Sequence, residues 1–188
     1  MTRPYLTPIP AMEPHRTAIA SAIPVLETER LILRAPQLAD WPELEPIWRT
    51  ERGRFIGGPF DEDDAWLDFT QAVASWVLRG IGYWTVTAKT DRAVLGLVGI
   101  GMEIPDPEPE LGWLLTEAAE GQGIGLEAAT AVRDYAFAQG LPTCISFIDP
   151  ANARSVALAE RLGARRDPDV LSADAPDLVY RHTVPGAA

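Results

Sequence analysis

The sequence has a single cysteine, Cys144, and only two histidines, His15 and His182. A lone cysteine cannot close an internal disulfide, which fits a reducing, cytoplasmic environment. No neighbour in the sequence suggests activation of the thiol, so we expect Cys144 to be inert packing within a strand. Neither histidine forms a ligand pattern with carboxylates or cysteine, and no metal site is expected.

The chain also lacks a long apolar run and an excess of positive charge. No stretch of about 18 apolar residues is present, so we expect no transmembrane helix and no membrane partner. The N-terminus is rich in proline and has no apolar core, which makes it a poor signal peptide. The formal net charge is −11, and such a surface repels phosphate backbones, so a nucleic-acid partner is disfavoured.

What is present is a composition typical of a globular protein. The 188 residues are 47% hydrophobic and 23% charged, which suits one ordinary domain with its own core. Residues 1–24 are rich in Pro, Thr and Ala and show no periodicity, so we interpret them as a flexible tail or a loosely packed arm. Residues 25–186 are then the folded domain.

The first half of the domain predicts one strand and two helices. Residues 28–34 alternate as a strand does, with Leu31 and Leu33 on one face. Asp40 is expected to cap a helix that runs through Trp48. The glycines of residues 55–60 end that helix, and the acidic residues 61–64 suit the start of a longer one that stops at Gly80.

The second half predicts a strand-rich order that contains one crossover. The expected elements are strands 83–88 and 94–104 as a hairpin, strand 110–115, a helix from the turn 120–125 to Gln139, strand 143–148, a helix ending at Gly163 and strand 178–184. This order implies a mixed α/β domain with at least one parallel strand pair, joined by a right-handed connection.

The turn at residues 120–125 reads Glu-Gly-Gln-Gly-Ile-Gly and opens a helix. Backbone N–H groups and the helix dipole make such a turn a phosphate site, and glycine allows the anion to approach closely. A P-loop would need Gly-Lys-Ser/Thr at its end, but the chain reads Gly-Ile-Gly-Leu over residues 123–126 and has no lysine there. A dinucleotide fold would need a small residue at Leu126, so both are disfavoured. A tight turn that binds nothing remains an alternative.

A series of motifs resembles one enzyme family in the same order along the chain. GNAT acetyltransferases carry Arg/Gln-x-x-Gly-x-Gly/Ala at this turn, and this sequence keeps both glycines but has Glu120 at the first position. The resemblance is to the RimJ/RimL-type branch, which acetylates ribosomal-protein N-termini, and it extends over about residues 26–166. The other similar segments are residues 29–34, 110–115, 127–129, 134–137, 149–155 and 158–163.

The resemblance implies a GNAT-like fold and acetyl-CoA as co-substrate. In that fold a twisted, mostly antiparallel sheet, flanked by helices, splays at a parallel pair, here the strands of Trp113 and Phe147. The pantetheine arm would lie in the V, pairing with open backbone groups. The implied cofactor contacts are Trp113, Leu114 and Leu115 for the pantetheine, Gly121, Gln122, Gly123, Ile124, Gly125 and Leu126 for the pyrophosphate, Asn152 for the cofactor arm, and Ser155 near the thiol.

The implied reaction is transfer of acetyl to a primary amine by direct attack. A carboxylate can take the proton of the amine. Glu110, on the strand that lines the thioester, is the first candidate, and Glu103 is the second, although either could be only a solvated strand end. Many family members place a tyrosine acid where this sequence has Ala159. Ser155 could replace that acid, or it could only help to begin a helix.

The acceptor side is less defined. Phe55 and Phe60 bound the glycine-containing segment where acceptor loops of the family lie, and Trp84 is a further candidate, although tryptophans are most often core. The amine could belong to a protein N-terminus or to a small molecule. A non-catalytic GNAT-like module that binds acyl-CoA or a partner remains the alternative function, and either a monomer or a homodimer is compatible with the sequence.

Overall fold

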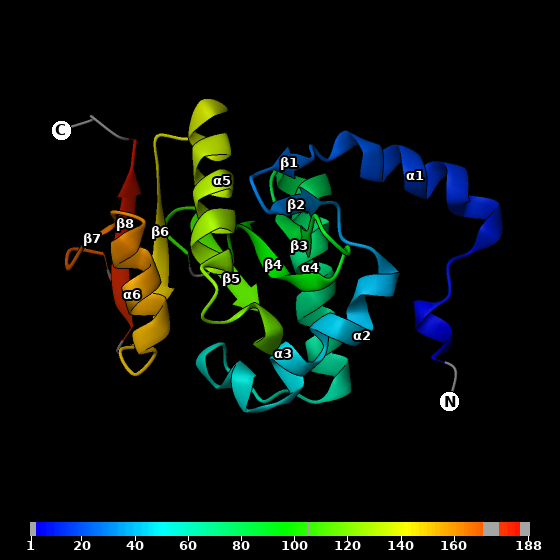
Figure 1. The fold of residues 1–188 in the computed structure, drawn as a ribbon, viewed down its shortest axis with the longest axis horizontal. Helices are drawn as coiled ribbons and strands as arrows, with labels where there is room; N and C mark the ends of the chain where they lie inside the picture. Colours follow the sequence, from blue (N-terminus) through cyan, green and yellow to red (C-terminus); the bar gives the residue numbers. More distant parts are fainter. Residues whose placement is uncertain (1–2, 105, 171–176, 185–188) are drawn as a thin grey trace.

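The computed structural model describes residues 3–104, 106–170 and 177–184. The domain is a mixed α/β fold built on one open sheet of eight strands in the order β1-β2-β3-β4-β5-β6-β8-β7, with helices on both faces (Figure 1). The strands are β1 (Leu26–Glu27), β2 (Leu31–Arg34), β3 (Tyr83–Ala88), β4 (Val94–Gly101), β5 (Glu110–Leu115), β6 (Thr143–Ile148), β7 (Arg165–Arg166) and β8 (Leu178–Thr183). All neighbouring strands pair antiparallel except β5 and β6, which are parallel.

The helices are α1 (Glu13–Ala22), α2 (Trp41–Leu44), α3 (Pro46–Arg49), α4 (Glu62–Arg79), α5 (Ile124–Ala138) and α6 (Ala153–Arg161). Short 3₁₀ turns are η1 (Pro4–Leu6), η2 (Pro10–Met12), η3 (Leu38–Asp40), η4 (Glu51–Phe55) and η5 (Glu117–Ala119). The fold class expected from the sequence is confirmed, including the single parallel pair and its helical crossover, α5.

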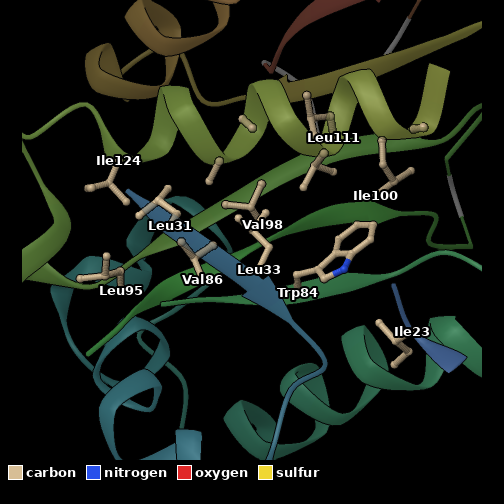
Figure 2. Close-up of a cluster of buried hydrophobic side chains, with 14 of the residues drawn as sticks. Ile23, Leu31, Leu33, Trp84, Val86, Leu95, Val98, Ile100, Leu111 and Ile124 are labelled. Carbon is tan, nitrogen blue, oxygen red and sulfur yellow. The ribbon is translucent and has the colours of Figure 1, made fainter. Parts of the chain in front are cut away.

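Two apolar clusters hold the helices to the sheet. The larger cluster packs α5, through Ala128, Val132 and neighbours, on side chains such as Leu33 and Trp84 (Figure 2). The second cluster packs α2, α3 and α4 on the opposite face, where Leu97 and Leu114 lie. In β2, Leu31 and Leu33 are fully buried on one face of the sheet, while Ile32 and Arg34 are not, as the alternation predicted.

The helix α4 begins and ends where the sequence predicted. The carboxylate of Asp61 accepts a hydrogen bond from the Asp64 backbone N–H at 2.9 Å, which is a standard N-cap. Gly80 follows the last turn with a left-handed φ of 73°, a conformation that glycine adopts without a steric cost. The strand β4 is shorter than predicted, because it ends at Gly101 rather than continuing to residue 104.

Asp40 corrects the prediction that it caps the following helix. Its carboxylate makes no capping bond to α2. It instead accepts hydrogen bonds from the Gln37 backbone N–H at 2.9 Å and from the Thr85 hydroxyl at 2.8 Å, and it pairs with Arg34 through two bonds. Asp40 is therefore a buried tie between β2, β3 and η3, and its link to β3 depends on Thr85, which lies far away in the sequence.

The N-terminal segment contains α1, which the absence of periodicity did not predict. None of its residues is buried, and Figure 1 shows it extending along one side of the domain. The segment before it is attached, since the Tyr5 hydroxyl donates to Glu62 at 2.6 Å and the Tyr5 ring packs edge-on against Trp66. The division at residue 24 stays a prediction.

The single cysteine and His182 are both buried in the sheet. Cys144 is buried, and burial raises the pKa of its thiol to about 12, so it stays protonated. His182 is buried beside the Ser146 hydroxyl, and burial lowers the pKa of its imidazole to about 4. Within residues 3–104, 106–170 and 177–184, no helix is long and apolar enough to cross a membrane, and no cluster of metal-ligating side chains is found.

Candidate functional site

The parallel pair β5 and β6 is joined at one point only. The single register pair is Glu110 with Ile145, where the Ile145 N–H donates to the Pro109 carbonyl at 3.0 Å. Beyond that pair, hydrogen bonds that involve a side chain link β5 and β6 in place of backbone–backbone hydrogen bonds. The Ser146 hydroxyl donates to the Leu111 carbonyl at 2.6 Å, and the Phe147 N–H donates to Glu110 Oε1 at 3.2 Å. The strands part from there, as the resemblance implied, and we call this opening the seam.

The edge of β5 that faces the seam carries backbone groups of alternate residues. The carbonyls of Leu111 and Leu115 point away from β4, because they accept bonds from Ser146 and Arg52 respectively. Trp113 lies between them and has the same orientation by the two-residue repeat of a strand. The backbone of Leu114 faces its partner Leu97 in β4 instead, so any contact of Leu114 with the pantetheine would be made by its partly exposed side chain.

The glycine turn has the backbone shape of an anion site. Gly121 and Gly123 adopt left-handed φ values of 70° and 75°, and Gly123 precedes α5 without any side-chain cap. The N–H groups at the start of α5 are thus open to a ligand at the positive end of the helix dipole. Gly125 has a packing role, because a Cβ there would lie 2.9 Å from the Leu115 side chain.

The remaining predicted residues of the turn divide between the surface and the core. The Gln122 side-chain amide donates a hydrogen bond to the Ala118 backbone carbonyl. The backbone carbonyl of Gln122 accepts a hydrogen bond from the Arg30 guanidinium at 2.9 Å. Ile124 is a member of the core, and Leu126 packs against it. Any contact of Gln122, Ile124 or Leu126 with a phosphate would therefore be made by the backbone.

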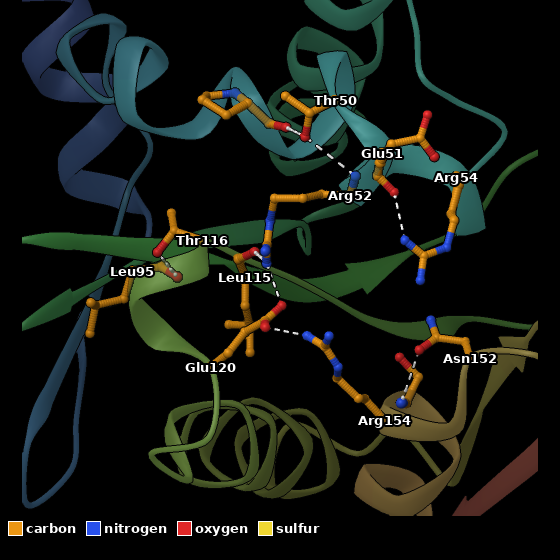
Figure 3. A network of polar contacts seen from close by, with 12 residues as sticks. Thr50, Glu51, Arg52, Arg54, Leu95, Leu115, Thr116, Glu120, Asn152 and Arg154 are labelled. Carbon is orange, nitrogen blue, oxygen red and sulfur yellow. Dashed lines mark hydrogen bonds and ion pairs between the residues drawn. The ribbon is translucent and has the colours of Figure 1, made fainter.

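Glu120 stands where the family motif has arginine or glutamine, and the structure shows what it does (Figure 3). One carboxylate oxygen accepts from Arg52 of η4 at 2.6 Å, and the other pairs with Arg154 of α6. The same Arg52 guanidinium donates to the Leu115 carbonyl at 2.8 Å. Two arginines from distant segments therefore bring positive charge to the turn. The sequence reasoning missed both, although Arg154 lies inside the 149–155 motif.

Asn152 and Ser155 link α6 to the seam. Asn152 is the N-cap of α6, and its Oδ1 accepts from the Ser155 N–H at 3.2 Å. The Ser155 hydroxyl accepts from Trp113 Nε1 at 3.0 Å, so its own proton is still available for donation. Ala159, at the position of the family tyrosine, is fully buried.

The two candidate bases differ in their surroundings. Burial raises the pKa of the Glu110 carboxyl to about 8, and the nearby charges of Asp106, Glu103 and Asp177 add to the rise, against the Phe147 N–H bond, which lowers it. A carboxyl with such a pKa is tuned for proton transfer near neutral pH. Glu103 is exposed, beyond the end of β4. The geometry therefore favours Glu110.

The candidate acceptor residues are not brought together. Phe55, at the end of η4, lies under the Arg54 guanidinium, 4.3 Å from the ring centroid, and Phe60 packs on the cluster of α2, α3 and α4. Trp84 corrects the prediction, because its side chain is fully buried and its Nε1 donates to the Pro24 carbonyl at 2.7 Å. The ring packs edge-on against Trp76 and Tyr135, so it fills the core and presents no surface to an acceptor.

This arrangement matches a known domain. A family model described as acetyltransferase (GNAT) domain matches residues 30–165. The chain belongs to the GNAT acetyltransferase family. An acetyltransferase from Agrobacterium tumefaciens strain C58 shares 40% identity with this GNAT chain, with a TM-score of 0.83, covering 86% of this chain and 95% of that one.

Two more distant structures contain a ligand. The microcin C7 self-immunity acetyltransferase MccE, in complex with acetyl-CoA and AMP, is 17% identical, with a TM-score of 0.64 over 84% of this chain and 94% of that one. RimL, a ribosomal L7/L12 α-N-protein acetyltransferase in complex with coenzyme A, is 16% identical, with a TM-score of 0.68 over 86% and 98%. At these identities the likeness concerns the fold of the GNAT domain.

Proposed function

We propose that this GNAT chain is an N-acetyltransferase that moves the acetyl group of acetyl-CoA to a primary amine by direct attack. The observation that carries the proposal is the seam, where an open strand edge, a glycine turn and a carboxyl of raised pKa lie along one path. Family membership and the acetyl-CoA and coenzyme A complexes of relatives support acetyl-CoA as the co-substrate.

The proposed contacts follow the path from the turn to the base. Gly121 and Gly123 receive the pyrophosphate at the N-terminus of α5, with Arg52 and Arg154 close by. The backbone of Trp113 on the seam edge pairs with the pantetheine as a neighbouring strand would. Asn152 lies on the opposite side of the seam, at the start of α6.

The proposed chemistry uses Glu110 and Ser155. The neutral amine nitrogen forms a bond to the acetyl carbon, and Glu110 in its ionised form takes the proton that the nitrogen loses as this bond forms. The carbon–sulfur bond breaks, and the Ser155 hydroxyl, held by Trp113, donates a hydrogen bond or its proton to the departing sulfur. The motif resemblance supports a place in the RimJ/RimL-type branch, with a protein N-terminus as one acceptor class.

Calorimetry tests the co-substrate first, with acetyl-CoA and CoA as ligands and NAD and ATP as controls. Selective binding of acetyl-CoA is expected. Thiol release from acetyl-CoA is then measured with alanyl-alanine amide, seryl-alanine amide and spermidine as acceptors. Thiol release in the presence of at least one amine supports acetyl transfer. Acetyl-CoA binding without thiol release in the presence of any of these amines would instead indicate a non-catalytic module. Absence of acetyl-CoA binding would overturn the proposal.

A further inference from the structure

Tyr83, the first residue of β3, lies across a row of glycines toward the strand that lines the seam. Tyr83 pairs with Gly99 of β4, and Gly99 pairs with Gly112 of β5, so the three residues form one line across the sheet. A Cβ on Gly99 would lie 2.6 Å from the Tyr83 Cγ. A Cβ on Gly112 would lie 3.0 Å from its Cζ and 2.1 Å from its hydroxyl oxygen. The ring therefore spans β4, and its hydroxyl lies directly over Gly112.

This position places the hydroxyl beside the proposed base. Glu110 and Gly112 are two residues apart on β5, so both project from the same face of the sheet. Gly101, the partner of Glu110 in β4, also faces the tyrosine, since a Cβ there would lie 3.6 Å from the hydroxyl oxygen. Trp113, whose backbone forms the seam edge, follows Gly112 directly. The Tyr83 hydroxyl thus lies at the junction of the base and the seam.

The surroundings keep this hydroxyl in its neutral form. Burial raises the pKa of the Tyr83 phenol well above its ordinary value, and the negative charges of Glu110, Asp68, Glu103 and Asp106 raise it further. A neutral phenol can accept one hydrogen bond and donate another, but it cannot serve as a base near pH 7. Among the residues that the structure describes, no hydrogen bond engages this hydroxyl, so it is available to a ligand.

Backbone packing explains Gly99, because a Cβ there would lie 2.3 Å from the Tyr83 Cα, but apolar packing alone does not account for Gly112. The Tyr83 ring does join the apolar cluster of α2, α3 and α4, and phenylalanine would fill that space equally well. The contact at Gly112 concerns the far end of the side chain, because the absent Cβ there is nearer to the hydroxyl oxygen than to any ring carbon. The sheet thus leaves room for the hydroxyl itself.

We propose that the Tyr83 hydroxyl is a catalytic residue that holds the amine nitrogen of the acceptor beside Glu110, over Gly112. This inference rests on the proposed function. One N–H of the neutral amine donates to the Tyr83 oxygen, which aims the nitrogen lone pair at the acetyl carbon. After the N–C bond forms and the C–S bond breaks, a second proton of the nitrogen has gone to Glu110 and the sulfur leaves as thiol or thiolate.

The arrangement selects for primary amines. A neutral primary amine has two N–H groups, one for Tyr83 and one to be lost to Glu110. An N-methyl amine has one N–H group, which it must lose, so it keeps none for Tyr83. The hydroxyl should therefore stabilise the reaction of a primary amine and contribute little to that of its N-methyl analogue.

The test compares Tyr83→Phe with the wild type on two acceptors, alanyl-alanine amide and N-methylalanyl-alanine amide. We expect kcat/KM for the primary amine to fall about 10–100-fold, as for loss of one well-placed hydrogen bond, and that for the N-methyl amine to change less than about 3-fold. The Kd of acetyl-CoA and the Tm should stay unchanged. Tyr180→Phe is the matched control, since it removes a tyrosine hydroxyl that donates to Glu160 of α6 and does not contact Gly112 or Glu110.

A second variant reaches the same contact without altering the tyrosine. Gly112→Ala places a methyl group 2.1 Å from the hydroxyl oxygen, which must displace it, and we expect the same selective loss for the primary amine. Equal losses for both amines, or weaker acetyl-CoA binding by Tyr83→Phe, would show a structural role and overturn the inference. Unchanged kinetics would also overturn it and leave the proposed function intact. A wild-type protein that acetylates no amine overturns both.

Discussion

Glu110→Gln removes the proton acceptor but keeps the shape of the side chain and an oxygen for the Phe147 N–H. The pKa of Glu110 is raised from 4.5 to about 8, so about one tenth of the carboxyls are ionised at pH 7. If the ionised form is the base, kcat/KM of the wild type should rise about tenfold per pH unit up to pH 7.5 and level off above pH 8. The variant should lose this limb, with kcat/KM lower by about 10²–10⁴.

The same carboxyl gives a stability signal that does not need an acceptor. Its folded-state pKa lies above the unfolded value, so the folded state binds the proton more tightly, and stability is lost as pH rises from about 4.5 to about 8. At 1.36 kcal/mol per pH unit the loss is at most about 5 kcal/mol. We expect about half of this, because Glu110 remains partly exposed. Glu110→Gln should lack the decline, so its Tm should gain on the wild type above pH 6.

The assay is thiol release from acetyl-CoA between pH 5.5 and 9.5, together with thermal unfolding over the same range. The acceptor amine has its own deprotonation, which adds a limb that the variant keeps, so the difference between the two profiles is the informative quantity. An unchanged profile in Glu110→Gln, or loss of the acid limb in Glu103→Gln instead, would refute the assignment of Glu110 as base. A wild-type Tm that does not fall relative to the variant would refute the raised pKa.

Three further changes test other parts of the site and fold. Gly123→Trp should weaken acetyl-CoA binding at least tenfold by blocking the anion site; Gly140→Trp, at another left-handed glycine with open space around it, is the matched control, and equal affinities would refute the turn assignment. Glu120→Gln should tighten acetyl-CoA binding about 3–10-fold at low salt by releasing positive potential from Arg52 and Arg154, an effect that salt should diminish; weaker binding would contradict it. Asp40→Asn should destabilise the fold by about 3–5 kcal/mol, because Arg34 loses its buried partner, and lower the Tm by roughly 10 °C; a Tm within about 2 °C of wild type would contradict the buried tie.

The sequence was informative wherever a local pattern determines the structure. The alternation of Leu31 and Leu33, the acidic helix start at residues 61–64 and the terminating Gly80 each act within a few residues, and the structure has them as predicted. The helix α1 was missed because Ile19 is its single large apolar residue and is exposed, so its sequence has too few large apolar residues to show a helical repeat. The two-residue strands β1 and β7 exist only through their pairing with β2 and β8, and no local signal marks them.

The site divides in the same way. The glycine turn, Asn152 and Ser155 belong to contiguous motifs, so their neighbourhood could be read from the sequence. Arg52 and Tyr83 come from segments distant along the chain. The side-chain hydrogen bonds of Arg52 to Leu115 and Glu120 bring it to the seam, and the register of the sheet places Tyr83 there. The role of Trp84 was misjudged because it depends on which side of β3 faces the core, where the ring is fully buried.

The sheet lacks most of the backbone hydrogen bonds that could join β5 and β6. The strands β1 to β5 on one side and β6 to β8 on the other meet through Glu110 and Ile145, and a bound acetyl-CoA would supply the missing rungs. A ligand that binds only the folded state adds about 2.7 kcal/mol of stability at 100 times its Kd. The lifetime of the protein in the cell should then follow the supply of acetyl-CoA, so that the enzyme is better protected from degradation when its acetyl donor is abundant.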